Sequence, residues 1–436
     1  MKKPGADKIA LLGFLVLALI IAHLIIISKS TVKFSGPIKL ICDNLSVSLP
    51  SGNGWQNENQ WRYHENTFAV SSIFISGRGS VTAMANCRYL LAPPAIAADI
   101  QCRQKALAMN GTIEKTGQIT TGKLTFDWAL IKKRTMPLKM FFGITSLPNN
   151  RQVNIELFHT EDNAERAEQI FKNLADHLRV KNNTLLEAGG KTVTELKNKQ
   201  ISSLLENRSY ESFFIITDTK GNPAGFTIDM FAAGNQTPLN IEGTSSFYLQ
   251  RPLPEQQIIS FKSDDGFNEF TCRADSGSVF GAKTTEVQLD KITTVTVRKL
   301  APPAEKKIYH VGPAAVPEFF IDQLLSQFLD STYKQIIVDI IEADGKIVPA
   351  LISRTDITGA DDKDNASYLL NMEILDGSGS SQKTYLNSRK QILKISLQQK
   401  DLYVLEKTDL ENIVKQFPEQ AGYVLDRSRF LKQRQQ

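Results

Sequence analysis

Apolar and polar positions alternate with a period of two in several segments between residues 40 and 180. Leu45, Val47 and Leu49 share one face of a short extended run that ends at Pro50. This period is typical of strands that bury one face of a sheet. The same pattern predicts further strands at 68–75, 80–91, 123–134 and 153–158.

Two segments between and after these strands repeat apolar residues at helical spacing. The first runs from about Ala95 to Met109, and the second follows the capping pair Asp162 and Glu165. The apolar stripe of the second consists of Ala167, Ile170, Phe171, Leu174 and Leu178. We therefore predict two helices that pack against the sheet.

This order of elements resembles the PsbP-like domain of photosystem accessory proteins, of DcrB-type envelope lipoproteins and of the nuclear Ran-release factor. The resemblance covers about residues 40–180. The residues that carry it are Leu45, Val47, Leu49, Pro50 and Trp55 at the start, and Phe171 and Leu174 near the end. It implies an antiparallel sheet with helices against it. Because members of that family are mostly noncatalytic accessory or binding modules, it also lowers the expectation of an enzyme.

A second region, residues 207–418, is rich in short strand-like runs bounded by Gly, Asp, Asn or Pro. It follows a linker and helical stretch at 181–206, and Asp344-Gly345 predicts a hairpin within it. Two helices are expected, one after Pro317 and one after the capping box that begins at Thr408. A basic tail, residues 419–436, ends the chain.

The second region resembles the strand-rich envelope domains found beside transglutaminase-like proteins, and more distantly periplasmic lipoprotein carriers. The residues that carry this resemblance are Tyr210, Asp218, Gly221, Gly225, Asp344, Gly345, Tyr385 and Thr408. It implies a larger curved β-sheet or half-open barrel with a few helices. The predicted class for the whole chain is therefore α+β, with an N-terminal transmembrane helix, a PsbP-like antiparallel sheet with helices, and this β-rich domain.

The run from Ile9 to Ile27 is uncharged and strongly apolar. At about 1.5 Å per residue, a helix of this length would span about 28 Å, close to the hydrocarbon thickness of a bilayer. A cleaved signal peptide usually has a shorter apolar core and ends in small residues, whereas this run ends Leu-Ile-Ile-Ile-Ser-Lys. We therefore predict an uncleaved single-pass helix over residues 9–28 that follows a cytoplasmic tail of residues 1–8.

This prediction places the bulk of the chain outside the cytoplasm, on the periplasmic side of an inner (plasma) membrane. The bacterial setting follows from the PsbP-like resemblance alone, and a eukaryotic secretory-pathway protein is the open alternative. Composition agrees with a globular protein, since 42% of the 436 residues are apolar and 22% are charged. A net charge of +5 is too small over this length to indicate a nucleic-acid partner.

The sequence contains few patterns that carry chemistry. The five histidines lie far apart, and no Gly-x-Ser-x-Gly motif or phosphate-binding loop occurs. Asp361, Asp362 and Asp364 form the one dense acidic cluster, whose carboxylates could bind Ca²⁺ or the metal ion of a glycosyltransferase. The cluster lacks the glycine and the late glutamate of a calcium loop, which favours a solvated hairpin tip. We predict no cofactor.

Four cysteines allow three pairings if all are oxidised. Cys87 and Cys102 form the favoured pair, because both lie in the first domain, and buried free thiols are the alternative.

Together these patterns predict a noncatalytic accessory or binding protein that engages an envelope protein partner or a hydrophobic ligand. Two alternatives stay open. One is a membrane-anchored hydrolase or glycosyltransferase, and the other is lipid or lipoprotein handling by a half-open barrel.

Overall fold

The computed structural model describes residues 32–420 except 41–43, 77–78, 161–163, 206–208, 235–239, 251–253, 279–280, 291–292, 301, 358–365 and 399–401. The predicted cytoplasmic tail and transmembrane helix, residues 1–28, lie outside this range, as do Asp361, Asp362 and Asp364 and most of the basic tail. Within the described part of the chain, no helix combines the length and the apolar composition needed to span a bilayer.

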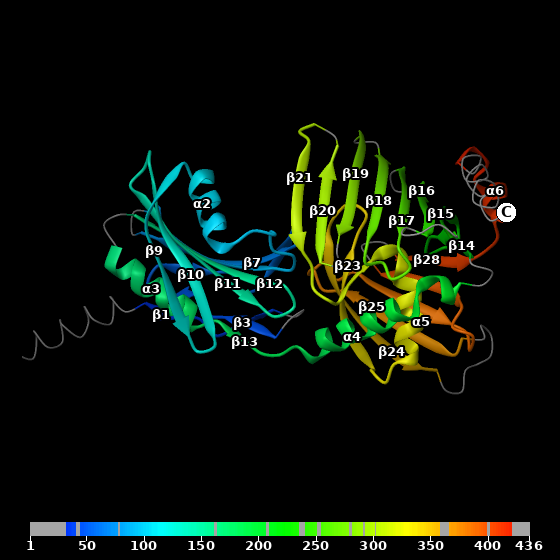
Figure 1. The fold of residues 1–436 in the computed structure, drawn as a ribbon, viewed down its shortest axis with the longest axis horizontal. Coiled ribbons are helices and arrows are strands. Elements are labelled where there is room, and N and C mark those ends of the chain that lie inside the picture. The colour runs from blue at the N-terminus through cyan, green and yellow to red at the C-terminus, as the bar shows by residue number, and fades with distance from the viewer. Residues whose placement is uncertain are drawn as a thin grey trace, which may run out of the picture.

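The predicted α+β class is wrong, because the fold is mainly β. Strands make up 55% of the structure and helices 19%. The excess of strands arises in the second region, where eight consecutive segments from Ser209 to His310 form antiparallel neighbours without an intervening helix. Figure 1 shows these strands, β14 to β21, side by side.

The first sheet has eight antiparallel strands. Its order is β5-β7-β8-β12-β11-β10-β9, and β6 pairs with β7. The strands are β5 (Trp55–Asn57), β6 (Arg62–His64), β7 (Thr67–Ile75), β8 (Val81–Leu90), β9 (Gly111–Thr121), β10 (Leu124–Lys133), β11 (Leu138–Leu147) and β12 (Arg151–Thr160). Small sheets beside it contain β1 (Lys33–Phe34), β2 (Ile38–Leu40), β3 (Leu45–Val47), β4 (Pro50–Ser51) and β13 (Arg179–Val180).

Helices cover both faces of this first sheet. α3 (Ala164–Asp176) packs Phe171 and Leu174 into one hydrophobic cluster, and α2 (Ala98–Ala108) packs Ala106 into another. Because both faces are covered, strand β11 is almost wholly buried.

The second sheet has fifteen strands, in the order β21-β20-β19-β18-β17-β16-β15-β14-β28-β27-β26-β25-β24-β23-β22. Its first group of strands is β14 (Ser209–Thr217), β15 (Pro223–Ala233), β16 (Ile241–Leu249), β17 (Glu255–Ser263), β18 (Phe270–Ser278), β19 (Gly281–Asp290), β20 (Thr294–Lys299) and β21 (Glu305–His310). The second group is β22 (Ala315–Pro317), β23 (Gln335–Ile341), β24 (Ile347–Asp356), β25 (Tyr368–Ile374), β26 (Ser381–Leu386), β27 (Ile392–Gln398) and β28 (Leu402–Lys407).

Side chains from helices fill the inner face of the second sheet, which we define as the face that carries Phe261. The helical segments are α4 (Thr184–Lys199), η2 (Ile201–Leu204), η4 (Glu318–Phe320) and α5 (Ile321–Asp330). Phe320, Leu324 and Phe328 are fully buried there among the inward side chains of the strands. Burial of this large apolar surface is the main stabilising contribution of the second region. A short helix, α6 (Leu410–Gln416), packs on the opposite, outer face.

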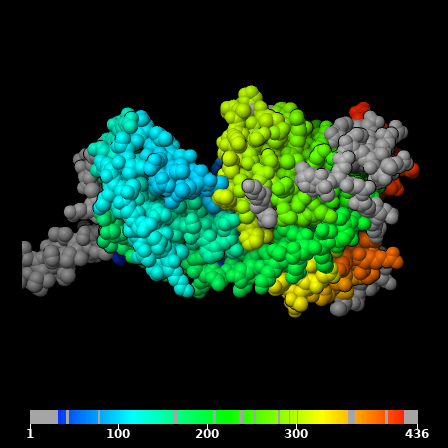
Figure 2. Space-filling view, viewed as in Figure 1, coloured from blue at the N-terminus to red at the C-terminus, as the bar shows by residue number. Residues whose placement is uncertain are grey.

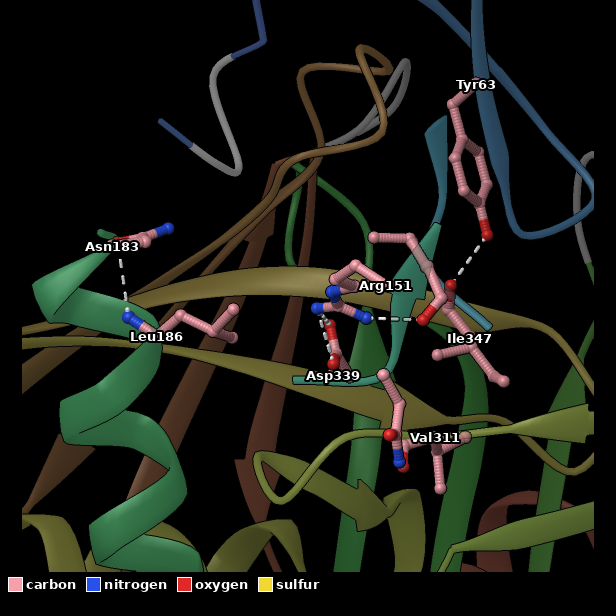
Figure 3. Close-up of polar contacts among 9 residues, drawn as sticks. Tyr63, Arg151, Asn183, Leu186, Val311, Asp339 and Ile347 are labelled. Atoms are coloured by element: carbon pink, nitrogen blue, oxygen red, sulfur yellow. Dashed lines mark hydrogen bonds and ion pairs between the residues drawn. The ribbon is translucent and has the colours of Figure 1, made fainter. Parts of the chain in front are cut away.

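A buried ion pair joins the two sheets (Figure 3). Nη2 of Arg151, at the start of β12, donates hydrogen bonds of 2.8 and 2.7 Å to the two carboxylate oxygens of Asp339 on β23. Its Nη1 donates to the carbonyl oxygen of Leu91 at 2.6 Å. The two charged side chains are only 3% and 1% exposed.

Further hydrogen bonds support the same junction. The hydroxyl of Tyr63 donates to the carbonyl oxygen of Ile347 at 2.8 Å, and the Asn150 amide donates to that of Val311 at 2.7 Å. The backbone amide of Ile347 donates to Asn66 at 2.7 Å. Figure 2 shows a notch between the two sheets. A pocket of about 410 Å³, which His310 helps to line, lies at this junction.

Candidate functional site

The outer face of the second sheet carries a trough of about 590 Å³ that crosses strands β16 to β20. Two cross-strand rows of side chains line it. One row is Thr244, Ser260, Arg273, Glu286 and Arg298. The other is Glu242, Lys262, Thr271, Gln288 and Thr296. Because side chains alternate between the faces of a sheet, both rows point away from the inner core.

Buried residues of the intervening row anchor the floor of the trough. Phe261, Cys272 and Val287 point inward and are almost fully buried. Gly243 completes this row, and a Cβ atom there would lie 2.4 Å from Cβ of Phe231 and 2.5 Å from Cζ of Phe261. The aromatic ring of Phe261 therefore occupies the space that a larger residue at 243 would need.

Charges of both signs lie along the trough. Nζ of Lys262 contacts a carboxylate oxygen of Glu242 at 2.7 Å, and Nε of Arg273 contacts one of Asp275 at 3.3 Å. The basic members of both pairs are more than half exposed, so each pair contributes little to stability and depends on ionic strength. Hydroxyl groups of four serine and threonine residues lie between the charges. Carbon atoms contribute most of the exposed surface of the trough, so the lining suits a surface that combines apolar area with polar, hydrogen-bonding groups.

Helix α6 occupies the same face beside the trough. Ile413 of the helix and Phe417, which directly follows it, pack on Phe226, Met230 and Tyr248. The ring centroids of Phe226 and Phe417 are 5.4 Å apart. The helix begins at a cap in which Asp409 accepts a hydrogen bond from the backbone amide of Asn412. Met230 is the cross-strand neighbour of Thr244, so α6 covers the part of the outer face that adjoins the trough.

The disulfide between Cys87 and Cys102 does not form. Both thiols are free, and they lie in different hydrophobic clusters. Cys87 on β8 points into the cluster under α3, whereas Cys102 on α2 packs with residues of the opposite face of the sheet. Burial raises the pKa of the Cys102 thiol to about 11 and raises that of Cys87 further. Both side chains therefore behave as small apolar core residues.

The other sequence-predicted candidates are not brought together in a site. The predicted acidic cluster, Asp361, Asp362 and Asp364, falls outside the described residues. Within the described ranges, no group of three or more His, Cys, Asp or Glu side chains could hold a metal ion.

The sequence alone does not identify the trough residues, because they come from five strands and share no fixed spacing. The available signal is the alternation of polar and apolar residues within each strand, which shows that a face is solvated. It does not show which strands become neighbours.

Comparisons with known proteins give distant structural similarities only. No protein-family model and no curated protein matches the chain. A β-barrel-like protein of the domain of unknown function DUF1849 from Brucella abortus aligns with 47% of this chain and 98% of its own, with 9% identity and a TM-score of 0.37. A Bacteroides thetaiotaomicron VPI-5482 protein aligns with 37% of this chain and 60% of its own, with 10% identity and a TM-score of 0.21. The PsbP-like resemblance stays a prediction.

Proposed function

We propose that the chain is a noncatalytic binding protein that engages a partner protein through the trough on its outer face. The observation that carries this proposal is the trough itself, a space of about 590 Å³ lined by charges of both signs and by hydroxyl groups. Complementary charge patterns of this kind favour recognition between protein surfaces.

A partner protein fits the structure better than a hydrophobic ligand. Lipid handling by a half-open barrel requires an apolar space on the inner face, and Phe320, Leu324 and Phe328 occupy that face. The trough on the outer face is lined mainly by polar and charged side chains, and their carbon atoms contribute most of its exposed surface. The mode of binding that follows is contact with a protein surface that combines apolar area with charged and hydrogen-bonding groups, rather than enclosure of an apolar molecule.

Membrane attachment and an extracytoplasmic location complete the proposal. They rest on the uncharged apolar run from Ile9 to Ile27 and on the charge of the short segment before it. The proposed location is an inner (plasma) membrane, with the bulk of the chain on the periplasmic side. The PsbP-like resemblance supports an accessory role for such a protein.

Charge reversal in the trough tests this function. Full-length protein and the double variant Arg273→Glu/Arg298→Glu are purified under mild conditions from solubilised membranes of the source organism. Both arginines are exposed on the trough wall. The matched control is Lys383→Glu, at an exposed basic residue on β26.

We expect one protein to copurify with the wild type and with Lys383→Glu, and its yield to fall about tenfold or more with the double reversal, because like charges then face each other. The proposal is contradicted if the same proteins copurify equally with all three forms, or if none does.

A further inference from the structure

One end of the first sheet lies away from the second sheet. Arg151, at the start of β12, lies at the junction of the two sheets. At about 3.3 Å per residue, Thr160 at the other end of β12 lies about 30 Å from it. Figure 1 shows that α3, which follows β12, lies on the side of the first sheet away from the second. We call the end of the sheet that contains Thr160 the distal end.

The described chain begins at this distal end. β7 and β12 run in the same direction, since each pairs antiparallel with β8, so Ile75 at the end of β7 lies there. The backbone amide of Ile75 donates a hydrogen bond of 2.9 Å to the carbonyl oxygen of Gly54. Because β1 runs antiparallel to β4, the chain before Lys33 leaves toward this turn at 52–54. The segment that precedes Lys33 therefore joins the first region at its distal end.

The predicted membrane helix, residues 9–28, is close to this point in the sequence. Three residues separate it from Val32, the first described residue. At no more than about 3.6 Å per residue, the four steps from 28 to 32 span at most about 14 Å. In the proposed membrane attachment, on which this inference rests, the distal end therefore lies next to the lipid headgroups.

Exposed apolar side chains gather at the same end. The three most exposed large apolar side chains in the described ranges are Leu107 at 78%, Val81 at 58% and Met136 at 55%. Val81 begins β8, and Met136 lies in the turn between β10 and β11. Leu107 lies beside that turn, because Asn110, just after α2, bonds through its backbone amide to the carbonyl oxygen of Leu107 and through its carbonyl oxygen to the amide of Arg134.

The turn between β10 and β11 is also basic. Lys133 and Arg134 lead into it, and neither forms an ion pair with another residue in the described part of the chain. Lys139, on the other side of the turn, is engaged by Glu114 at 2.6 Å. The acidic residues at 161–162 follow β12 in the sequence and lie outside the described ranges. The unpaired cations of the distal end are therefore those beside Leu107 and Met136.

We propose that the distal end docks on the surface of an anionic lipid bilayer. Leu107 and Met136 insert among the headgroups, and Lys133 and Arg134 bind lipid phosphates. Interfacial binding of this kind combines burial of exposed apolar area with attraction of basic side chains to anionic lipids. The short tether favours docking, since it keeps the two surfaces at a high effective concentration. The second sheet is then held at the far end of β12, away from the lipid, where its trough is open to a partner.

Site-specific photo-cross-linking to lipid tests this docking. A photoreactive amino acid replaces Leu107 or Met136 in full-length protein that is reconstituted into vesicles. The control position is Leu300 in the second region, which is 44% exposed. One set of vesicles contains phosphatidylglycerol and phosphatidylethanolamine in equal parts, and the other contains phosphatidylcholine alone. Mass spectrometry measures the lipid adducts.

We expect lipid adducts from positions 107 and 136 in the anionic vesicles, at least about fivefold more abundant than from position 300. The yield should be about threefold lower in phosphatidylcholine, because the basic side chains lose their anionic partners.

Charge removal tests the role of the basic turn. With the photoreactive group at position 107, Lys133→Gln/Arg134→Gln should lower the adduct yield in anionic vesicles about fivefold. The matched control is Lys283→Gln/Lys383→Gln, which removes two exposed lysines from the second sheet and should leave the yield unchanged.

Flotation of the vesicles separates the possible failures. The docking proposal is overturned if the protein floats with the vesicles but gives no lipid adduct at 107 and 136, or equal adducts at 300. It is also overturned if the two double variants give equal yields, or the two kinds of vesicle do. Protein that does not float with either vesicle overturns the proposed membrane attachment and the docking together. None of these results bears on partner binding in the trough.

Discussion

Removal of the buried arginine between the two sheets should have a large and specific effect on stability. In Arg151→Met the Asp339 carboxylate, 1% exposed, would lose both hydrogen bonds from the guanidinium and keep its charge in a buried site. Breaking a buried ion pair from one side costs about 3–5 kcal/mol, mostly because the remaining charge is uncompensated. The carbonyl oxygen of Leu91 also loses its donor. We expect the free energy of unfolding to fall by about that amount.

The assay is urea unfolding followed by two probes. All three tryptophans, Trp55, Trp61 and Trp128, lie in the first region, so their fluorescence reports that region while circular dichroism reports both. In the wild type the two transitions should coincide, because the junction couples the sheets. In Arg151→Met we expect them to separate.

The double variant Arg151→Met/Asp339→Leu is the control. It removes both charges and fills the site with apolar groups, and such replacements are often neutral or stabilising. We expect it to recover most of the lost stability. A loss below about 1 kcal/mol in the single variant, or an equal loss in the double variant, would refute the view that an uncompensated buried charge sets the cost.

Two further predictions concern other buried groups. Burial, and then the carboxylate of Glu342, raise the pKa of Glu318 from 4.5 to about 8. The folded protein therefore holds a proton that the unfolded chain releases, and stability contributed by this group falls as pH rises from about 4.5 to about 8. Glu318→Gln should remove this pH-dependent loss of stability. The denaturant midpoint of the variant should therefore exceed that of the wild type at pH 9 but not at pH 4.5. Gly189→Ala should lower the free energy of unfolding by more than about 2 kcal/mol, because the new Cβ atom would lie 1.9 Å from a backbone oxygen of β23. The neighbouring variant Gly190→Ala should not, because its Cβ atom would lie 3.5 Å from the nearest atom. Thermal unfolding of the two alanine variants checks this, and equal melting temperatures would contradict it.

Strand periodicity predicts only part of the first sheet. The segments at 68–75, 80–91 and 123–134 correspond to β7, β8 and β10. The pattern misses β11, because α2 and α3 cover opposite faces of the sheet and leave a continuous apolar run without alternation. It also misses β9, an edge strand whose side chains are largely exposed and polar.

The start of α4 shows how tertiary packing overrides a local signal. Gly189 and Gly190 suggest a linker, yet they lie inside a helix that begins at Thr184. Asn183 caps it by accepting hydrogen bonds from the backbone amides of the second and third residues after it (Figure 3). The glycine at 189 is required because the helix approaches β23 too closely for any side chain. The sequence alone contains no sign of that approach.

The candidate site depends on long-range pairing and could not be read from spacing. The trough rows arise only when five hairpin-connected strands adopt one register, which the sequence leaves open. Alternation within each strand shows that one face is polar, and the location of the site follows only from the fold.

Site-specific photo-cross-linking in cells tests the central claim, a partner bound in the trough, most directly. A photoreactive amino acid replaces Thr271, an exposed residue that lines the trough, or Lys383, an exposed residue on β26 outside it. We predict one discrete protein adduct from position 271 and none of that mass from position 383. No adduct at position 271, or the same adducts from both positions, would contradict the account.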